Sequence, residues 1–228
     1  MYDLIIYSLT FVAFIITSGA QLFVTSTYKK YIEVQNGKKI TGADVARKIL
    51  DKNGLRSVDV VETSGFLSDH YDPSSKVVRL SSDNYKTASI AAVSVAAHEC
   101  GHAIQDKNNY LFLRLRASLV PVVNFSSYAG YLAIVIGGIT GIFGLIKIGI
   151  LLECVILLFQ IVTLPVEIDA SRRALREVKE YGYLSKGEFG SGRLVLIAAA
   201  LTYVASVASA LLQILRLVLI YGRREEKK

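Results

Sequence analysis

Cysteine is scarce in this chain, and charge is absent from long parts of it. Only two of the 228 residues are cysteines, Cys100 and Cys154, which excludes a disulfide framework and favours two small buried side chains. Asp, Glu, Lys and Arg are missing from residues 4–28, 117–146 and 194–215, and residues 148–166 carry only Glu153. A bilayer core about 30 Å thick requires roughly 20 helical residues. The sequence therefore predicts four transmembrane helices.

The first apolar run also lacks the basic residues that precede the apolar core of a secretory signal peptide. Asp3 stands before it, whereas Lys29 and Lys30 follow it, so we interpret it as a retained anchor with its N-terminus outside. Residues 26–116 hold 14 of the 26 Lys and Arg, and residues 167–193 hold 6 more. Because basic residues mark cytoplasmic loops, both segments are expected on the cytoplasmic side, and the net charge of +7 does not indicate nucleic-acid binding.

What the chain does contain is the sequence His98-Glu99-Cys100-Gly101-His102. Two histidines four residues apart project from one face of a helix and can share a zinc ion, and the glutamate between them is placed to activate a water. The preceding residues 87–97 carry no charge and are mostly Ala, Val and Ile, which indicates a buried helix. Together with four apolar runs, the motif indicates an integral-membrane metalloprotease.

A catalytic zinc ion needs a third protein ligand that leaves one position open for water. His70 and Glu167 are the two candidates, and Glu167 is favoured because it begins a helix on the same predicted side as the motif. A transmembrane hairpin bridges the 65 residues between His102 and Glu167, so their separation in sequence is no obstacle. Ala170, Ser171 and Ala174 share the helical face of Glu167, and small residues there favour close packing on the motif helix.

Other polar residues have less specific interpretations. His70, Arg172 and a tyrosine remain open as the group that stabilises an oxyanion, and His70 is also a candidate for lining the substrate groove. Asp169 is expected to face away from Glu167 and to pair with a nearby arginine. Glu153 is an intramembrane carboxylate, which hints at function, but 14 helical residues, or about 21 Å, separate it from Glu167.

The segment between the first apolar run and the motif predicts a small mixed region. Residues 41–52 have a helical pattern closed by Asn53 and Gly54. Residues 58–63 and 76–81 are β-branched and strand-like, which predicts a small sheet, with a hairpin as one arrangement, packed on the motif helix.

Two features after the motif concern helix boundaries. Pro165 indicates a kink or a fresh helix start. The glycines at 187, 190 and 192 predict a loop, which is a candidate lid for the site.

A family resemblance rests on three segments: LSDHYDP at 67–73, AHECGHAIQ at 97–105 and LPVEIDAS at 164–171. Together they resemble the bacterial membrane-bound neutral zinc metallopeptidases (YugP-like) and, more distantly, HtpX-type membrane proteases, over nearly the whole chain. The resemblance implies a zincin in which His98, His102 and Glu167 bind one zinc ion per chain and Glu99 is the general base. HtpX-like proteins have an Asp four residues after the third ligand. Ser171 stands there in this chain and would hydrogen-bond a ligating histidine instead.

The expected fold is a mainly α membrane protein, with about four transmembrane helices and a zincin-like cytoplasmic catalytic domain that contains a small β-sheet. The expected segments are a first transmembrane helix (1–25), the catalytic domain (26–116), a transmembrane hairpin (117–166), the helix of the third ligand with a loop (167–193), a last transmembrane helix (194–221) and a basic tail (222–228). In this orientation the tail would lie outside despite its charge, so its side stays open.

The expected activity is endopeptidase hydrolysis by a zinc-activated water, with Glu99 as the base. Polypeptides, chiefly membrane-associated ones, are the expected substrates, and the bacterial cytoplasmic membrane is the expected location, with the active site facing the cytoplasm. One rival is a non-catalytic zinc-binding membrane scaffold, against which the complete set of ligands and base argues. A second rival, a transporter or channel component, is weakened by the lack of repeated halves.

Overall fold

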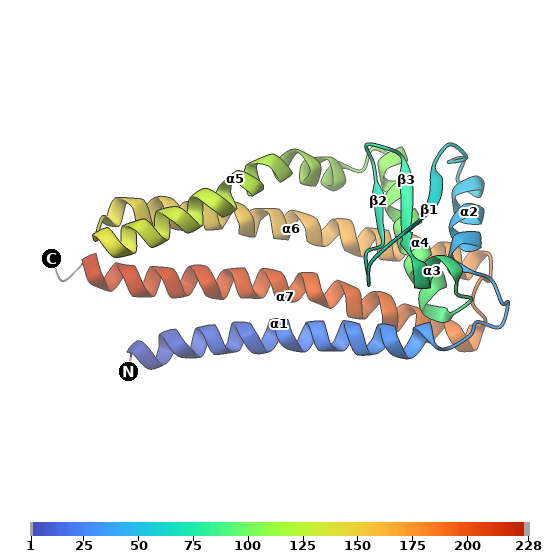
Figure 1. Ribbon diagram of the computed structural model, residues 1–228, viewed down its shortest axis with the longest axis horizontal. Coiled ribbons are helices and arrows are strands. Elements are labelled where there is room, and N and C mark those ends of the chain that lie inside the picture. The colour runs from blue at the N-terminus through green and yellow to red at the C-terminus, as the bar shows by residue number, and fades with distance from the viewer. Residues whose placement is uncertain (1, 226–228) are drawn as a thin grey trace. The chain divides into compact units, whose positions relative to one another are not determined.

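Figure 1 shows the chain as a computed structural model, which describes residues 2–225. Met1 and residues 226–228, the end of the predicted basic tail, lie outside the described residues. The helices are α1 (Tyr2–Ile32), α2 (Gly42–Lys52), α3 (Ser82–Lys86), α4 (Ile90–Lys107), α5 (Leu111–Thr140), α6 (Phe143–Glu180) and α7 (Lys186–Glu225). The strands are β1 (Asp59–Thr63), β2 (His70–Asp72) and β3 (Val77–Ser81).

Four helices, α1, α5, α6 and α7, are long and apolar enough to cross a membrane, which agrees with the four predicted spans. The turn between α5 and α6 lies at Gly141, whose φ of +72° favours glycine. Phe125 and Ile139 are exposed on these helices, as expected where lipid surrounds them. Cys154 is exposed as well. The prediction that Cys154 is buried was therefore wrong. A small apolar side chain on a membrane-spanning helix can face lipid instead of the protein interior.

The chain divides into two compact units. The first unit comprises Met1–Gln21, Leu115–Leu164 and Thr202–Lys228, and the second comprises Leu22–Arg114 and Pro165–Leu201. The sheet, α2, α3 and α4 all belong to the second unit. This unit therefore extends beyond the segment 26–116, because residues 165–201 also pack into it.

The predicted small sheet is present and has three strands in the order β1-β3-β2. β1 and β3 are the two predicted strands, and they pair in parallel, with Asp59 opposite Val77 and Thr63 opposite Ser81. The hairpin arrangement between them was therefore wrong. The connecting segment contains the three-residue strand β2, which pairs antiparallel with β3, so the chain reverses twice before β3.

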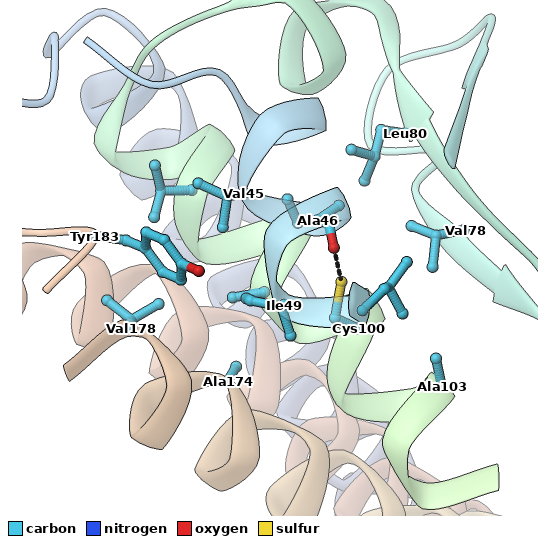
Figure 2. Packing of buried hydrophobic residues seen from close by; sticks show 14 of the residues in the cluster. Val45, Ala46, Ile49, Val78, Leu80, Cys100, Ala103, Ala174, Val178 and Tyr183 are labelled. Carbon is cyan, nitrogen blue, oxygen red and sulfur yellow. Dashed lines mark hydrogen bonds between the residues drawn. The ribbon is translucent and has the colours of Figure 1, made fainter. Parts of the chain in front are cut away.

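A hydrophobic core joins α2 and α4 inside the second unit (Figure 2). As predicted, α2 ends at Asn53, and Thr41 begins it with a capping box in which Thr41 and Asp44 bond each other's backbone N–H groups. Ile49 and Cys100 are fully buried in this core, and the Cys100 thiol donates to the Ala46 carbonyl at 3.6 Å. This core fixes the motif helix from one side.

Two predicted helix boundaries differ in the structure. Pro165 does not start a new helix, because α6 runs through it from Phe143 to Glu180. The glycine-rich segment at 187–192 is not a loop but the first turns of α7. Ser185 and Glu188 explain the helix start: the Glu188 carboxylate accepts the Ser185 N–H at 2.7 Å, a capping contact that outweighs the low helix propensity of glycine.

Candidate metal centre

The motif helix α4 places its polar residues inside the second unit. Ser89 caps its N-terminus by accepting the Ala92 N–H at 3.1 Å. Glu99 and His102 are only 7% and 8% exposed, although a buried helix rarely carries ionisable side chains without partners. One partner of His102, Glu167, comes from α6.

Helix α6 approaches α4 at two small residues. A Cβ atom added to Gly101 would lie 2.5 Å from the Ala170 carbonyl oxygen, so any side chain at position 101 would force the helices apart. Ala170 and Ala174 are fully buried in the contact. The small residues of α6 thus have the packing role that their spacing predicted, and the close approach brings Glu167 to α4.

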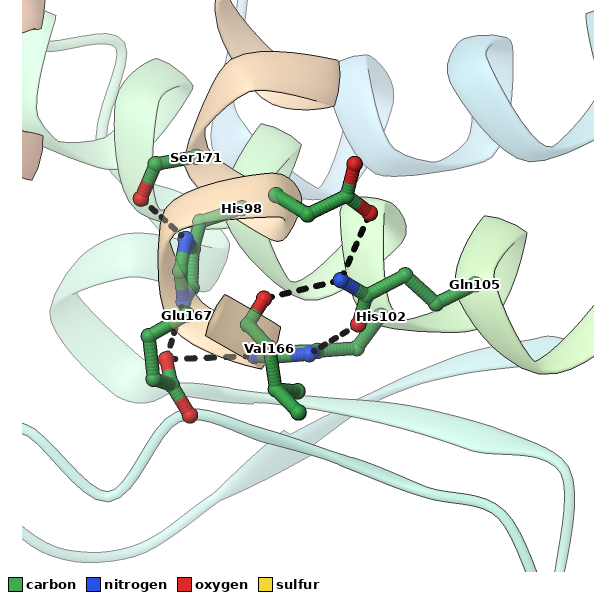
Figure 3. Close-up of polar contacts among 7 residues, drawn as sticks. His98, His102, Gln105, Val166, Glu167 and Ser171 are labelled. Atoms are coloured by element: carbon green, nitrogen blue, oxygen red, sulfur yellow. Dashed lines mark hydrogen bonds and ion pairs between the residues drawn. The ribbon is translucent and has the colours of Figure 1, made fainter. Parts of the chain in front are cut away.

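His98, His102 and Glu167 converge at this contact (Figure 3). The Glu167 Oε2 atom lies 3.2 Å from His98 Nε2 and 3.5 Å from His102 Nε2, and one potential ligand atom from each residue falls within 4.8 Å of the others. The two imidazole rings meet edge to face, 84° apart. Two imidazole nitrogens and a carboxylate oxygen are a donor set that zinc accepts.

The second ring nitrogen of each histidine, Nδ1, also lies within hydrogen-bond distance of a side chain. The His98 Nδ1 atom lies 3.1 Å from the Ser171 hydroxyl, and the His102 Nδ1 atom lies 3.0 Å from Gln105 Oε1. An amide oxygen only accepts, so Nδ1 of His102 carries the proton and its Nε2 has a free lone pair when the ring is neutral. That lone pair faces a carboxylate oxygen, an arrangement of two acceptors that is favourable only with a cation or a proton between them. The geometry therefore fits a bound metal ion.

Gln105 is a residue that the sequence reasoning missed. Its amide group donates to the Val166 carbonyl and to Asp169 Oδ2, both at 2.8 Å, which fixes Oε1 toward His102 (Figure 3). Asp169 also accepts from Arg173 at 2.6 Å, so it has the arginine partner that was predicted. Its spacing could have identified Gln105 as a partner of His102, because residues three apart lie on the same face of a helix.

Glu99 is the buried carboxyl beside this cluster. Burial raises its pKa most strongly, His98 and His102 lower it, and Glu167 and Asp69 raise it further, with a net upward shift. Burial also lowers the pKa of His102, but Glu167 and Glu99 outweigh burial and raise it. A buried carboxyl group beside residues that could hold a cation is placed where it could accept and return a proton.

The remaining sequence candidates lie outside the cluster. His70 begins β2 and is exposed, with its Nδ1 atom 2.8 Å from the Ser68 carbonyl oxygen. Among the described residues, the group that could hold a metal ion contains His98, His102 and Glu167 but not His70. Arg172 is exposed on α6.

Two comparisons with known proteins show which family this chain resembles. Residues 6–222 match the family described as "Putative neutral zinc metallopeptidase". The "Putative membrane protease YugP" of Bacillus subtilis (strain 168) is 44% identical over 219 residues, which cover 95% of this chain and 97% of that protein. No solved structure matches the chain.

Proposed function

The chain belongs to the neutral zinc metallopeptidase family, and we propose that it is a membrane-embedded zinc endopeptidase with a zincin-like catalytic centre. The observation that carries the proposal is the convergence of His98, His102 and Glu167 within 4.8 Å, next to a buried glutamate one position after the first histidine. A purely structural zinc site usually has four protein ligands, whereas three leave a position for water or substrate.

In the proposed mechanism, His98, His102 and Glu167 hold one zinc ion, which when bound lowers the pKa of a water and polarises the peptide carbonyl. Glu99 takes the proton from the attacking water and then donates it to the leaving amine, because it is buried beside the three proposed ligands. Ser171 and Gln105 keep the imidazole rings in the binding orientation through their Nδ1 atoms.

The edge strand β2 is the proposed place for an extended peptide substrate. It pairs with β3 along one side only, so its other side is available for a further strand. Asp69, directly before β2, accepts hydrogen bonds from Ser81 and Asn84 and acts electrostatically on Glu99. These contacts anchor the start of β2 near the proposed general base.

The proposed substrates are membrane-associated polypeptides, and the proposed location is the cytoplasmic membrane with the site facing the cytoplasm. Four apolar helices support the membrane location. The 14 Lys and Arg in residues 26–116 support a cytoplasmic position for the second unit.

The first test compares the purified wild type with Glu99→Gln for cleavage of a quenched fluorescent peptide library, with zinc measured in both. We expect equal zinc contents and a loss of about 100-fold or more in cleavage rate for the variant, because only the proton-transfer group is removed. Cleavage by the wild type should also stop after zinc is removed by a chelator.

Two outcomes would reject the proposal. Equal zinc with no cleavage by either protein, even of membrane-inserted substrates, would favour the zinc-binding scaffold. Cleavage that persists in Glu99→Gln at the wild-type rate would exclude Glu99 as the base.

A further inference from the structure

The first unit contains a cavity, open on one side and lined by both polar and apolar residues, that the proposed peptidase mechanism does not use. It has a volume of about 430 Å³ and is lined by parts of α1, α6 and α7. Six of its lining residues have polar side chains: Thr17, Glu153, Gln160, Ser206, Ser209 and Gln213. All three helices are candidate membrane spans, where polar side chains are costly and usually functional.

The polar residues of α6 and α7 follow the helical repeat, so each of these two helices presents a polar stripe to the cavity, and α1 adds Thr17. Glu153 and Gln160 are seven residues apart on α6, and Ser206 and Gln213 are seven residues apart on α7. The Ser209 hydroxyl of α7 donates to the Ala13 carbonyl of α1 at 3.4 Å, which joins two of the three helices. The cavity is thus formed by a coherent set of faces rather than by scattered polar residues.

Most of these side chains already have hydrogen-bond partners. Thr17 and Ser206 each donate to a carbonyl oxygen in the preceding turn, and Gln213 accepts from Arg216 at 3.3 Å. Glu153 and Gln160 differ from them. Glu153 makes no hydrogen bond or ion pair with any residue between 2 and 225. Gln160 Oε1 is a buried atom without a partner in that same part of the chain.

An ionised Glu153 carboxylate and the Gln160 Oε1 atom both accept hydrogen bonds, so a partner that keeps Glu153 charged must be a donor. In a hydrocarbon environment, an unmatched polar group costs several kcal/mol, which makes a donor favourable there. A protonated amine or a guanidinium supplies several N–H donors and also a positive charge for the Glu153 carboxylate. A space of about 430 Å³ also exceeds that of a few waters and suits a long side chain.

We propose that this cavity binds a transmembrane helix of another polypeptide through a lysine or arginine side chain, which reaches Glu153 and Gln160. Phe14 and Thr17 on its rim are exposed in the first unit, so a helix within the bilayer has access to it. Ser206, Ser209 and Ala210 are small and allow another helix backbone to approach closely. The site recruits a membrane partner and does not depend on peptide hydrolysis.

The test measures binding of single-span peptides to the full-length protein in lipid nanodiscs by energy transfer. The host peptide is a Leu/Ala helix with one central lysine, and the comparison peptide has alanine at that position. We expect the wild type to bind the lysine peptide about five- to tenfold more tightly than the alanine peptide. Glu153→Gln should abolish this preference, and Gln160→Leu should reduce it.

Asn124→Leu is the matched control, because Asn124 is an exposed amide of α5 that does not line the cavity. It should keep the full preference for lysine. Zinc content, measured for every variant, reports whether the second unit is still folded.

Three results would overturn the proposal. Equal binding of the two peptides would mean that the cavity does not select a basic side chain. A lysine preference that survives in Glu153→Gln would place the cation elsewhere. Energy transfer between two copies of this protein that the lysine peptide cannot displace would identify the cavity as a self-association surface.

Discussion

At the scale of single residues, the centre depends on side chains that do not touch the metal position. Gln105 uses its two amide hydrogens on Val166 and Asp169, which leaves only its oxygen for His102. The tautomer of His102 is therefore set by a residue three positions away. Gln105 belongs to the same helix as the ligands but receives its orientation from α6.

Replacing Gln105 with leucine should weaken zinc binding by about 10- to 100-fold, because His102 loses the acceptor that fixes its ring. A competition titration against a zinc-binding dye measures the change. Gln35→Leu serves as the control, since Gln35 is an exposed residue of the same unit. An unchanged zinc affinity for the Gln105 variant would show that the ring orientation is set by other contacts.

A second residue-scale prediction concerns Asp106 at the end of α4. Burial raises its pKa, but hydrogen bonds from Lys76 and Tyr71 outweigh burial and lower it overall. A carboxyl group whose pKa is lower in the folded protein than in the unfolded chain stabilises the fold when the pH is above the unfolded-chain pKa of about 3.9. This stabilisation is lost as the pH falls through the pKa of the folded protein. Asp106→Asn should therefore destabilise the protein at neutral pH by an amount on the order of 1 kcal/mol.

Thermal unfolding in detergent across a pH series tests this prediction. The difference in unfolding temperature between the wild type and Asp106→Asn should become smaller as the pH falls below about 4. Asp59→Asn, at an exposed aspartate of the sheet, should show little difference at any pH. A gap for Asp106→Asn that is independent of pH would contradict the electrostatic origin.

At the scale of elements, the contact between α4 and α6 decides where Glu167 lies. Gly101 touches the backbone of Ala170, and Ala170 follows Glu167 by three residues on the same helix. A change in the distance between these helices therefore changes the distance between the ligands.

Gly101→Ala should cost about 1–3 kcal/mol of stability, because its Cβ has no room against a backbone carbonyl. Zinc affinity should fall with it. In Gly190→Ala, by contrast, the added Cβ meets nothing within 4 Å and lies inside α7, so we expect no loss or a small gain in stability. Thermal unfolding and zinc titration of both variants check the pair, and equal effects would contradict the role of the close contact.

The sequence predicted those elements whose signals are local. Local signals of this kind predicted the capping residues of α2, the four apolar runs and the small residues after Glu167. The structure contains each of them. The strand β2 has only three residues among turn formers, and strand direction depends on distant pairing, so neither was predictable. The glycines before residue 193 concealed the start of α7, although Ser185 and Glu188 offered the correct signal.

At the scale of the whole molecule, the distribution of basic residues makes a prediction about sidedness. Ser74 is an exposed residue of the basic segment, and Ile142 is exposed at the turn between α5 and α6. With four spans and the N-terminus outside, these two positions belong on opposite sides of the membrane.

Single cysteines introduced in a Cys154→Ser background test this orientation with a membrane-impermeant maleimide. Ser74→Cys should react only after intact bacterial cells are permeabilised, and Ile142→Cys should react without permeabilisation. Cys100 is buried and should contribute little background. The reverse labelling pattern would place the metal centre on the outer side.

The second unit is assembled from two stretches of chain, Leu22–Arg114 and Pro165–Leu201. This interruption sets an order of events during synthesis, because His98 and His102 leave the ribosome before the membrane hairpin (117–166) and Glu167 leaves directly after it. At about 5–20 residues per second, translation of the 65 residues from His102 to Glu167 takes roughly 3 to 13 seconds. Throughout that interval the growing chain lacks the proposed third ligand. The proposed metal centre therefore cannot be completed until the membrane hairpin has been made.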